Sequence, residues 1–301
     1  MTSPLVSIIT VTKDLVKNDR KESFEECVNS VRMQDYPNIE HLIIDGASQD
    51  GTTELFQELG LRYVSEEDTG IFNACNKGIQ FSKGDYIAFL SSDDFYTKKN
   101  AVSSVLEVMQ KERTDFSCAP FDLIDEAGNF LEKRPVRTFL FPFGMPFGHP
   151  TMFARRCCLE KLGGFDETFK ICADFDLINR CFVGGYKPSI LKESFVAFRL
   201  GGLSSSQLLT VEKENIRVVS KTCNMDEKEA KKAYETKHLP FFTLCSVLKK
   251  ARNLPERKLL LKRGAKESIK DFRHKILTCH LRKGKRCFRF LGITFYNEAK
   301  K

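Results

Sequence analysis

The chain has 301 residues, of which 42% are hydrophobic, so it is long enough for one large globular domain or for one domain and a smaller one. No apolar run approaches the ~20 residues that a membrane-spanning helix needs, and the N-terminus lacks the basic segment of a secretory signal. Eleven cysteines in a chain without such a signal predict reduced thiols and a cytoplasmic location, and the absence of a CxxC pair argues against a zinc site.

Charge is distributed very unevenly along the chain. Residues 249–301 contain 18 Lys or Arg and 4 Asp or Glu, whereas the rest of the chain has a net charge of −6. A basic segment beside a mildly acidic body predicts a polyanionic partner. Apolar and aromatic residues alternate with the cations, which fits an anchor on an anionic membrane surface, and nucleic acid is the rival partner. The alternative is a solvated helical face that packs on the rest of the protein or on a second subunit.

The first 110 residues alternate between predicted strands and helices. Short β-branched apolar runs predict strands, and apolar residues three or four positions apart predict helices. The predicted strands are 5–11, 39–44, 61–65 and 86–90, and the predicted helices are 23–36, 52–59, 70–81 and 100–110. This alternation predicts an α/β fold with a mixed, mostly parallel sheet and helices on both faces.

The second half is predicted to be less regular. It contains a hairpin turn at 127–129, a Phe- and Pro-rich loop at 138–150, a strand at 151–154, helices at 156–162 and 174–182, and a strand at 189–200. After a flexible boundary at 201–206, the pattern from Leu208 onward is helical and charged. The sequence therefore predicts two parts, a domain at 1–206 and a helical, basic C-terminal region at 207–301.

Polar residues directly follow three of the predicted strands. Thr10 and Thr12 end the first strand, Asp45 ends the second, and the adjacent Asp93 and Asp94 follow the fourth. In open α/β sheets ligands bind beyond the carboxyl ends of the strands, and carboxylate oxygens suit Mg²⁺ or Mn²⁺. The pattern predicts a ligand-binding edge with a metal site at Asp93 and Asp94. Simple capping of a turn is the alternative for these two carboxylates.

Five segments in order carry a family resemblance: VSIITVTKD, IIDGASQDGT, DTGIFNACNKGI, FLSSDD and GGFDETFKICADFDL. They resemble the inverting family-2 glycosyltransferases, which have the GT-A fold and include bacterial surface-polysaccharide enzymes. The resemblance covers roughly residues 5–205 and implies that residues 1–206 form the nucleotide-sugar-binding catalytic domain. It also implies a nucleotide-sugar donor, most often a UDP-sugar, a divalent metal (Mn or Mg), and a glycan or lipid-linked acceptor in surface-polysaccharide synthesis.

The resemblance implies roles for individual residues. Asp45 would read the uracil edge, Asp93 would bind the metal with Asp94 beside it, and Asp174 would be the base that deprotonates the acceptor hydroxyl. Asp176 is a nearby competitor for the base, and capping of a helix is the alternative role for Asp174. The implied nucleotide-sugar-binding residues are Thr10, Val11, Thr12, Asp45, Asn76, Lys77, Ser92 and Asp93. His149 is a weaker candidate for acceptor contact, because a lone histidine is more often structural.

Three positions depart from the family pattern. Lys13 stands where an aromatic residue is usual, Ser91 where Asp or Asn often opens the DxD motif, and Ala173 where Glu often precedes the base. Because the metal aspartate and the base are kept, the sequence predicts an active enzyme rather than an inactive relative. The resemblance implies a bacterial protein, and the cysteines and the basic segment predict that it is cytoplasmic and peripherally bound to the membrane. The alternatives are a catalytically silent nucleotide-sugar-binding or scaffold protein, and a nucleotidyltransferase. For the latter, no GxxxxGK[ST] P-loop is present.

Overall fold

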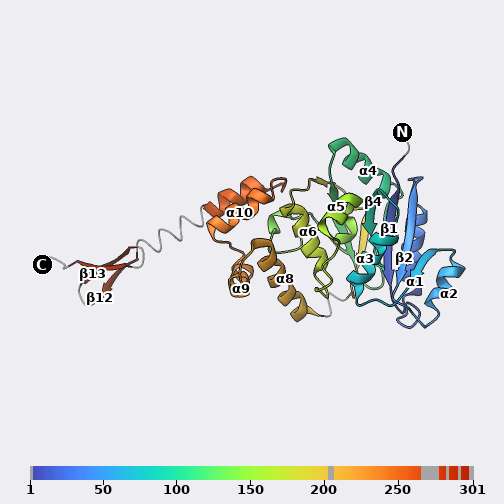
Figure 1. The fold of residues 1–301 in the computed structure, drawn as a ribbon, viewed down its shortest axis with the longest axis horizontal. Coiled ribbons are helices and arrows are strands. Elements are labelled where there is room, and N and C mark those ends of the chain that lie inside the picture. The colour runs from blue at the N-terminus through green and yellow to red at the C-terminus, as the bar shows by residue number, and fades with distance from the viewer. Residues whose placement is uncertain (1–2, 203–206, 266–277, 283–284, 291–292, 298–301) are drawn as a thin grey trace.

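A seven-stranded sheet forms the centre of the molecule (Figure 1). The computed structural model describes residues 3–202, 207–265, 278–282, 285–290 and 293–297. In spatial order the strands are β10 (Pro188–Ile190), β6 (Phe116–Cys118), β9 (Phe153–Arg155), β4 (Tyr86–Phe89), β1 (Val6–Thr12), β2 (Ile39–Asp45) and β3 (Arg62–Ser65). Only β9 runs antiparallel to its neighbours. The predicted mixed, mostly parallel sheet is therefore confirmed.

Helices cover both faces of this sheet, because successive residues of a strand point to opposite sides. Val6 and Ile8 pack into the apolar cluster of α1 (Lys21–Arg32) and α4 (Ala101–Glu112), near α2 (Thr52–Glu58). Ile9 packs into the cluster of α3 (Ile71–Phe81), α5 (Arg156–Leu162) and α6 (Ala173–Val183) on the other side. At Gly78 of α3, a Cβ atom would lie 2.5 Å from Cγ2 of Ile9, so only glycine allows this close packing of helix on strand.

A second, four-stranded sheet lies beside the end of β4. Its strands are β5 (Phe95–Tyr96), β11 (Val196–Arg199), β7 (Phe121–Ile124) and β8 (Phe130–Arg134). The predicted hairpin at 127–129 joins β7 to β8. The single strand predicted at 189–200 is wrong, because β10 pairs with β6 while β11 pairs with β5 and β7 in the second sheet. The predicted loop contains two short 3₁₀ helices, η1 (Thr138–Leu140) and η2 (His149–Thr151).

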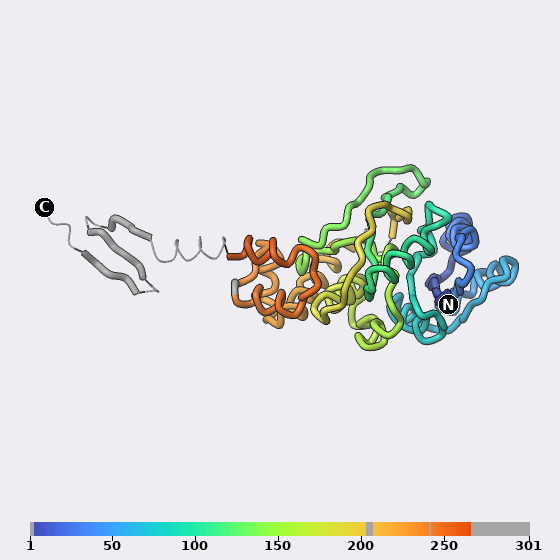
Figure 2. Tube along the Cα trace, turned by 90° about the horizontal axis from the view of Figure 1, so that it is seen from above, coloured from blue at the N-terminus to red at the C-terminus, as the bar shows by residue number. Residues whose placement is uncertain are grey.

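The helices after residue 206 pack on the preceding domain, through contacts with α6, rather than standing apart. They are α8 (Leu208–Cys223), α9 (Glu227–Thr236), α10 (Phe241–Lys250) and a further helical stretch at 257–265. Figure 2 shows them, in orange, on the side of the folded body away from the N-terminus. Ile216, Val218 and Val219 of α8 are buried in the same apolar cluster as Leu177 and Ile178 of α6. One core therefore extends across the predicted boundary at 206.

Residues 278–282, 285–290 and 293–297 differ from the helical prediction. The strands β12 (Thr278–Arg282), β13 (Lys285–Phe290) and β14 (Ile293–Asn297) form an antiparallel sheet. Side chains from residue 266 onward lie outside the described part, so membrane binding by the basic segment 249–301 stays a prediction. Among the helices that the structure describes, none is long and apolar enough to cross a membrane.

Candidate active site

A cavity of about 1320 Å³ opens beyond the carboxyl ends of β1 and β4 and is called here the main cavity. Its walls come from the ends of these strands, the start of α3, the loop between β8 and η2, the start of α6, and α8. Sites for one small ligand usually occupy about 300–1,000 Å³. The main cavity is therefore large enough for two reactants side by side. A side cavity of about 960 Å³ adjoins it, and Arg20, Asp93 and Arg199 line both.

Asp93 lies where the two cavities meet. Its side chain is 15% exposed, and its Oδ2 atom is 3.4 Å from Nη1 of Arg20, which comes from the loop before α1. In the part of the chain that the structure describes, no group of three or more His, Cys, Asp or Glu side chains is placed to hold a metal ion. Mg²⁺ is often bound by one or two carboxylates together with substrate phosphates. Asp93 fits a metal of that kind, whose remaining ligands would come from a diphosphate and water.

Asp94 is buried directly behind Asp93. Its Oδ1 atom accepts a hydrogen bond of 2.9 Å from the backbone N–H of Arg199, while Oδ2 has no hydrogen-bond partner among the described residues. Burial, and then the negative charge of Asp93, raise the pKa of Asp94 to about 7. A buried carboxylate oxygen without a partner is costly, and a cation beside it would offset that cost. This environment also fits a divalent ion at Asp93.

Arg199, at the end of β11, holds the segment that carries these two aspartates. Its Nε atom donates to the carbonyl oxygen of Asp93 at 3.1 Å, and its two Nη atoms donate to Glu126 O and Glu26 Oε2. The sequence analysis missed Arg199, because its partners lie between 73 and 173 positions away along the chain.

Asp45 is not among the residues that line the main cavity, and its predicted contact with a base edge stays a prediction. It is fully buried, and its two carboxylate oxygens are occupied by four hydrogen bonds. The donors are Thr12 Oγ1 at 3.3 Å, Ser48 N at 2.9 Å, Ser48 Oγ at 2.6 Å and Ser65 Oγ at 2.7 Å. Asp45 therefore joins the ends of β1, β2 and β3 and shapes the loop after β2.

Asp68 is the carboxylate that faces the main cavity in this region. A Cβ atom at Gly46 would lie 2.4 Å from Oδ2 of Asp68, so the missing side chain at position 46 leaves room for it. Its Oδ1 atom accepts a 2.9 Å hydrogen bond from the N–H of Gly70. Thr12 and Lys13 line the cavity close by. Sequence reasoning quoted the segment that begins with Asp68 but did not single this residue out.

Thr10, Asn76 and Lys77 were predicted to bind the donor, and the structure places all three away from the cavities. Thr10 is fully buried, with its hydroxyl 3.1 Å from Nε2 of His41, because its side chain points to the α1 face of β1. Asn76 exchanges hydrogen bonds with the backbone of Phe165, and Lys77 pairs with Glu66 at 3.3 Å. All three thus have partners within the protein, and their donor binding stays a prediction. Val11, Thr12 and Ser92 do line the main cavity.

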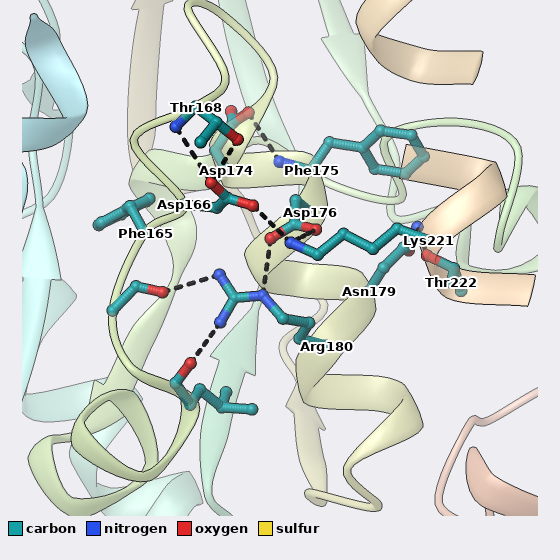
Figure 3. A network of polar contacts seen from close by, with 12 residues as sticks. Phe165, Asp166, Thr168, Asp174, Phe175, Asp176, Asn179, Arg180, Lys221 and Thr222 are labelled. Atoms are coloured by element: carbon teal, nitrogen blue, oxygen red, sulfur yellow. Dashed lines mark hydrogen bonds and ion pairs between the residues drawn. The ribbon is translucent and has the colours of Figure 1, made fainter. Parts of the chain in front are cut away.

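Asp174 and Asp176 occupy different environments, although both lie in the first turn of α6 (Figure 3). Asp174 lines the main cavity, and burial raises its pKa to about 6. Asp176 has a side chain only 2% exposed, with Oδ2 2.6 Å from Nε of Arg180 and Oδ1 2.9 Å from Nζ of Lys221. Two cations thus hold Asp176 in the packing between α6 and α8. Of the two carboxylates, Asp174 is the one placed to act on a ligand.

His149 and the aromatic loop line the wall of the main cavity near Asp174. The His149 ring stacks on Phe89, with centroids 5.4 Å apart, and burial lowers its pKa to about 4, so the ring is neutral. Leu140 and Met145 also line the cavity, whereas Phe141 is buried in the core. The loop therefore contributes apolar side chains both to the core and to the cavity wall.

Fold and site together define a class of protein. A mostly parallel sheet with helices on both faces, a carboxylate beyond β4 and a second carboxylate in the same cavity are the features of a GT-A-type glycosyltransferase. The family described as Glycosyl transferase family 2 matches residues 7–163, which is more than half of the chain. The chain belongs to this family.

Similar proteins agree with this class. The putative teichuronic acid biosynthesis glycosyltransferase TuaG of Bacillus subtilis (strain 168) is 34% identical over 137 residues, a match that covers 43% of this chain and 52% of TuaG. The match thus spans about half the length of that relative.

S. aureus TarS 1–349 in complex with UDP superposes with a TM-score of 0.59 at 14% identity, over 97% of this chain and 98% of TarS 1–349. The mannosyltransferase PcManGT from Pyrobaculum calidifontis, in complex with GDP-Man and Mn²⁺, gives a TM-score of 0.60 at 17% identity, over 89% of this chain and 81% of PcManGT. At these identities the two structures establish the fold alone.

Proposed function

We propose that this glycosyltransferase moves one sugar from a UDP-sugar to a glycan or lipid-linked acceptor in surface-polysaccharide synthesis, with inversion and with Mn²⁺ or Mg²⁺. The observation that carries the proposal is that Asp93 and Asp174 line one cavity large enough for donor and acceptor. The UDP complex of TarS and the Mn²⁺ complex of the mannosyltransferase, both with the same fold, support the choice of donor and metal. The name of TuaG supports a role in polysaccharide synthesis.

The nucleoside is proposed to lie at the end of β1. Val11 and Thr12 line the cavity there, and the Asp68 carboxylate supplies a hydrogen-bond acceptor for a base or ribose donor. The diphosphate would then extend toward Asp93. A divalent metal held there would neutralise the charge that develops on the departing nucleoside diphosphate. Arg20 is already 3.4 Å from Asp93 and is placed to contact the same phosphates.

Asp174 is proposed to remove the proton of the acceptor hydroxyl. A pKa of about 6 leaves this carboxylate ionised at neutral pH and more basic than an ordinary aspartate. The oxygen that loses its proton forms the new bond to the anomeric carbon as the bond to the diphosphate breaks. One such displacement inverts the configuration. The acceptor would lie along the apolar wall formed by Leu140, Met145 and Phe175.

A panel of nucleotide sugars tests this function. We expect one UDP-sugar to give UDP release in the presence of Mn²⁺ and EDTA to abolish the release, measured by a coupled UDP assay. Binding without turnover for every donor would favour the silent nucleotide-sugar-binding alternative. Pyrophosphate release from a nucleoside triphosphate would favour a nucleotidyltransferase. Either result would contradict the proposal.

The basic segment is proposed to hold the enzyme on an anionic membrane surface, at the inner face of the cytoplasmic membrane. In its described part, Lys249, Lys250, Lys258 and Lys262 are exposed, and Leu259 is exposed beside them. Replacing Lys258 and Lys262 by Glu should weaken sedimentation with phosphatidylglycerol vesicles, since each cation near an anionic surface contributes about 1 kcal/mol. Vesicles of phosphatidylcholine are the control. Equal sedimentation of variant and wild type would contradict membrane binding by this face.

A further inference from the structure

Glu214 of α8 holds the chain just before the helix that carries Asp174. Its carboxylate is buried and accepts three backbone hydrogen bonds, from Lys170 N at 2.7 Å, Ile171 N at 2.9 Å and Cys172 N at 2.9 Å. We propose that Glu214 is a positioning residue for the transfer reaction, which fixes the start of α6 and thereby the Asp174 carboxylate. This inference rests on the proposed function, in which Asp174 is the base.

The start of α6 needs such a partner from outside the helix. The first N–H groups of any helix lack acceptors within the helix, and Cys172, the residue at the N-cap position, makes no side-chain capping bond. Hydrogen bonds to an ionised carboxylate are about twice as strong as neutral ones. Glu214 bonds the three N–H groups that directly precede α6, and so fixes from α8, 42 positions further along the chain, the residues that lead into this uncapped helix start.

The position of Cys172 is transmitted directly to Asp174. The carbonyl of Cys172 accepts the N–H of Asp176 at 3.0 Å, which sets the first turn of α6. Asp174 lies in that turn, and its Oδ1 atom accepts the N–H of Phe175 at 2.7 Å. A shift of residues 170–172 would therefore move the carboxylate. Misplacement of a catalytic group by 1 Å can cost on the order of 10²-fold in rate.

Glu214 also acts on Asp174 through its charge. Among the described residues, the set of titratable groups with a charge interaction with Asp174 is Glu214 from α8, Cys75 from α3 and Cys172 before α6, while Asp68, His149 and Lys170 line the same cavity. Burial raises the pKa of both thiols, so both are neutral at physiological pH and Glu214 is the charged member of the set. After burial itself, the Glu214 charge is a further cause of the raised pKa of Asp174. Removing that charge should lower the pKa of the base.

The experiment compares Glu214→Gln with Glu212→Gln, an exposed carboxylate on the same helix. Both are assayed for UDP release from the UDP-sugar selected by the donor panel, as a function of pH and donor concentration. For Glu214→Gln we expect kcat to fall between about 10-fold and 10²-fold with an unchanged KM for the donor, and the acidic limb of the pH profile to move to lower pH. Glu212→Gln should match the wild type in all three quantities.

Two further variants make the outcome decisive. Glu214→Asp keeps the charge and shortens the side chain, so its kcat should fall while its acidic limb stays at the wild-type position; this variant also serves if Glu214→Gln does not fold. Wild-type kcat in both variants, or equal losses of kcat and UDP affinity, would overturn the inference. Asp174→Asn is run in parallel, because full activity in that variant would refute the proposed base whatever Glu214 does.

Discussion

Asp93→Asn is expected to lower the rate of UDP release by about 10³-fold, at the upper end of what removal of one preorganised electrostatic contact costs. The substitution keeps the shape of the side chain and removes its charge. The weaker metal site should then need far more Mn²⁺ for its residual activity. The measurement is the rate of UDP release across a Mn²⁺ titration, with calorimetric titration of UDP in the presence of Mn²⁺ as the binding readout.

The fold of this variant should be almost unaffected. The Arg20–Asp93 pair joins a side chain that is 41% exposed to one that is 15% exposed, and pairs of this kind contribute little to stability. Asp19→Asn is a matched control, since Asp19 lines the side cavity and has a φ of 54°, which Asn tolerates. An Asp93→Asn variant with the wild-type rate and the wild-type Mn²⁺ requirement would place the ion elsewhere and refute the proposed site.

The sheet and its ligand-binding edge could be predicted from sequence because both depend on local patterns. Apolar runs alternate with amphipathic stretches up to residue 110, and the motifs follow the strands directly, which places Asp93 at the edge of the sheet. Thr12, the last residue of β1, lines the cavity from the end of the strand, whereas before that residue the twofold alternation decides which side chains point to the cavity. Val11 therefore lines the cavity, while Thr10 is buried on the α1 face.

Residues that act through distant partners left no local signal. Glu214 looks like one more charged residue of a helix, and only the fold brings it to the three N–H groups before α6. Asp45 follows a strand, as a ligand-binding residue would, and the fold also gives its carboxylate hydrogen bonds from Ser48 and Ser65. In β13 and β14 the residues Phe288, Phe290, Ile293 and Phe295 alternate as in strands, and the prediction of a helix gave too much weight to the interleaved cations.

Asp174→Asn should lower transfer by ~10²–10⁴-fold while UDP binding is retained, because the variant lacks the base but keeps the donor site. In the wild type, activity should rise as the pH passes through about 6, where Asp174 loses its proton, and not near the ordinary aspartate value of 3.8.

The stability of the fold should depend on pH in the opposite direction to the activity, and fall as Asp174 loses its proton. A carboxyl group whose pKa is raised by folding favours the folded state at low pH and loses that contribution as the pH rises through the folded-state pKa. The ionised carboxylate therefore weakens the fold at neutral pH, so the variant should unfold at the same or a higher temperature at pH 7.5.

Asp176→Asn should lose stability and keep its activity, which is the reverse of what is expected for Asp174→Asn. The pair of variants therefore tests which aspartate in this helix turn is the base. Asp176 is buried between Arg180 and Lys221, and removing its charge leaves two cations with a weaker partner. We expect a lower melting temperature, measured by circular dichroism, and a nearly normal rate per folded molecule below that temperature. The base would have to be reassigned if Asp174→Asn kept the wild-type rate of UDP release, or if Asp176→Asn lost that rate while remaining folded.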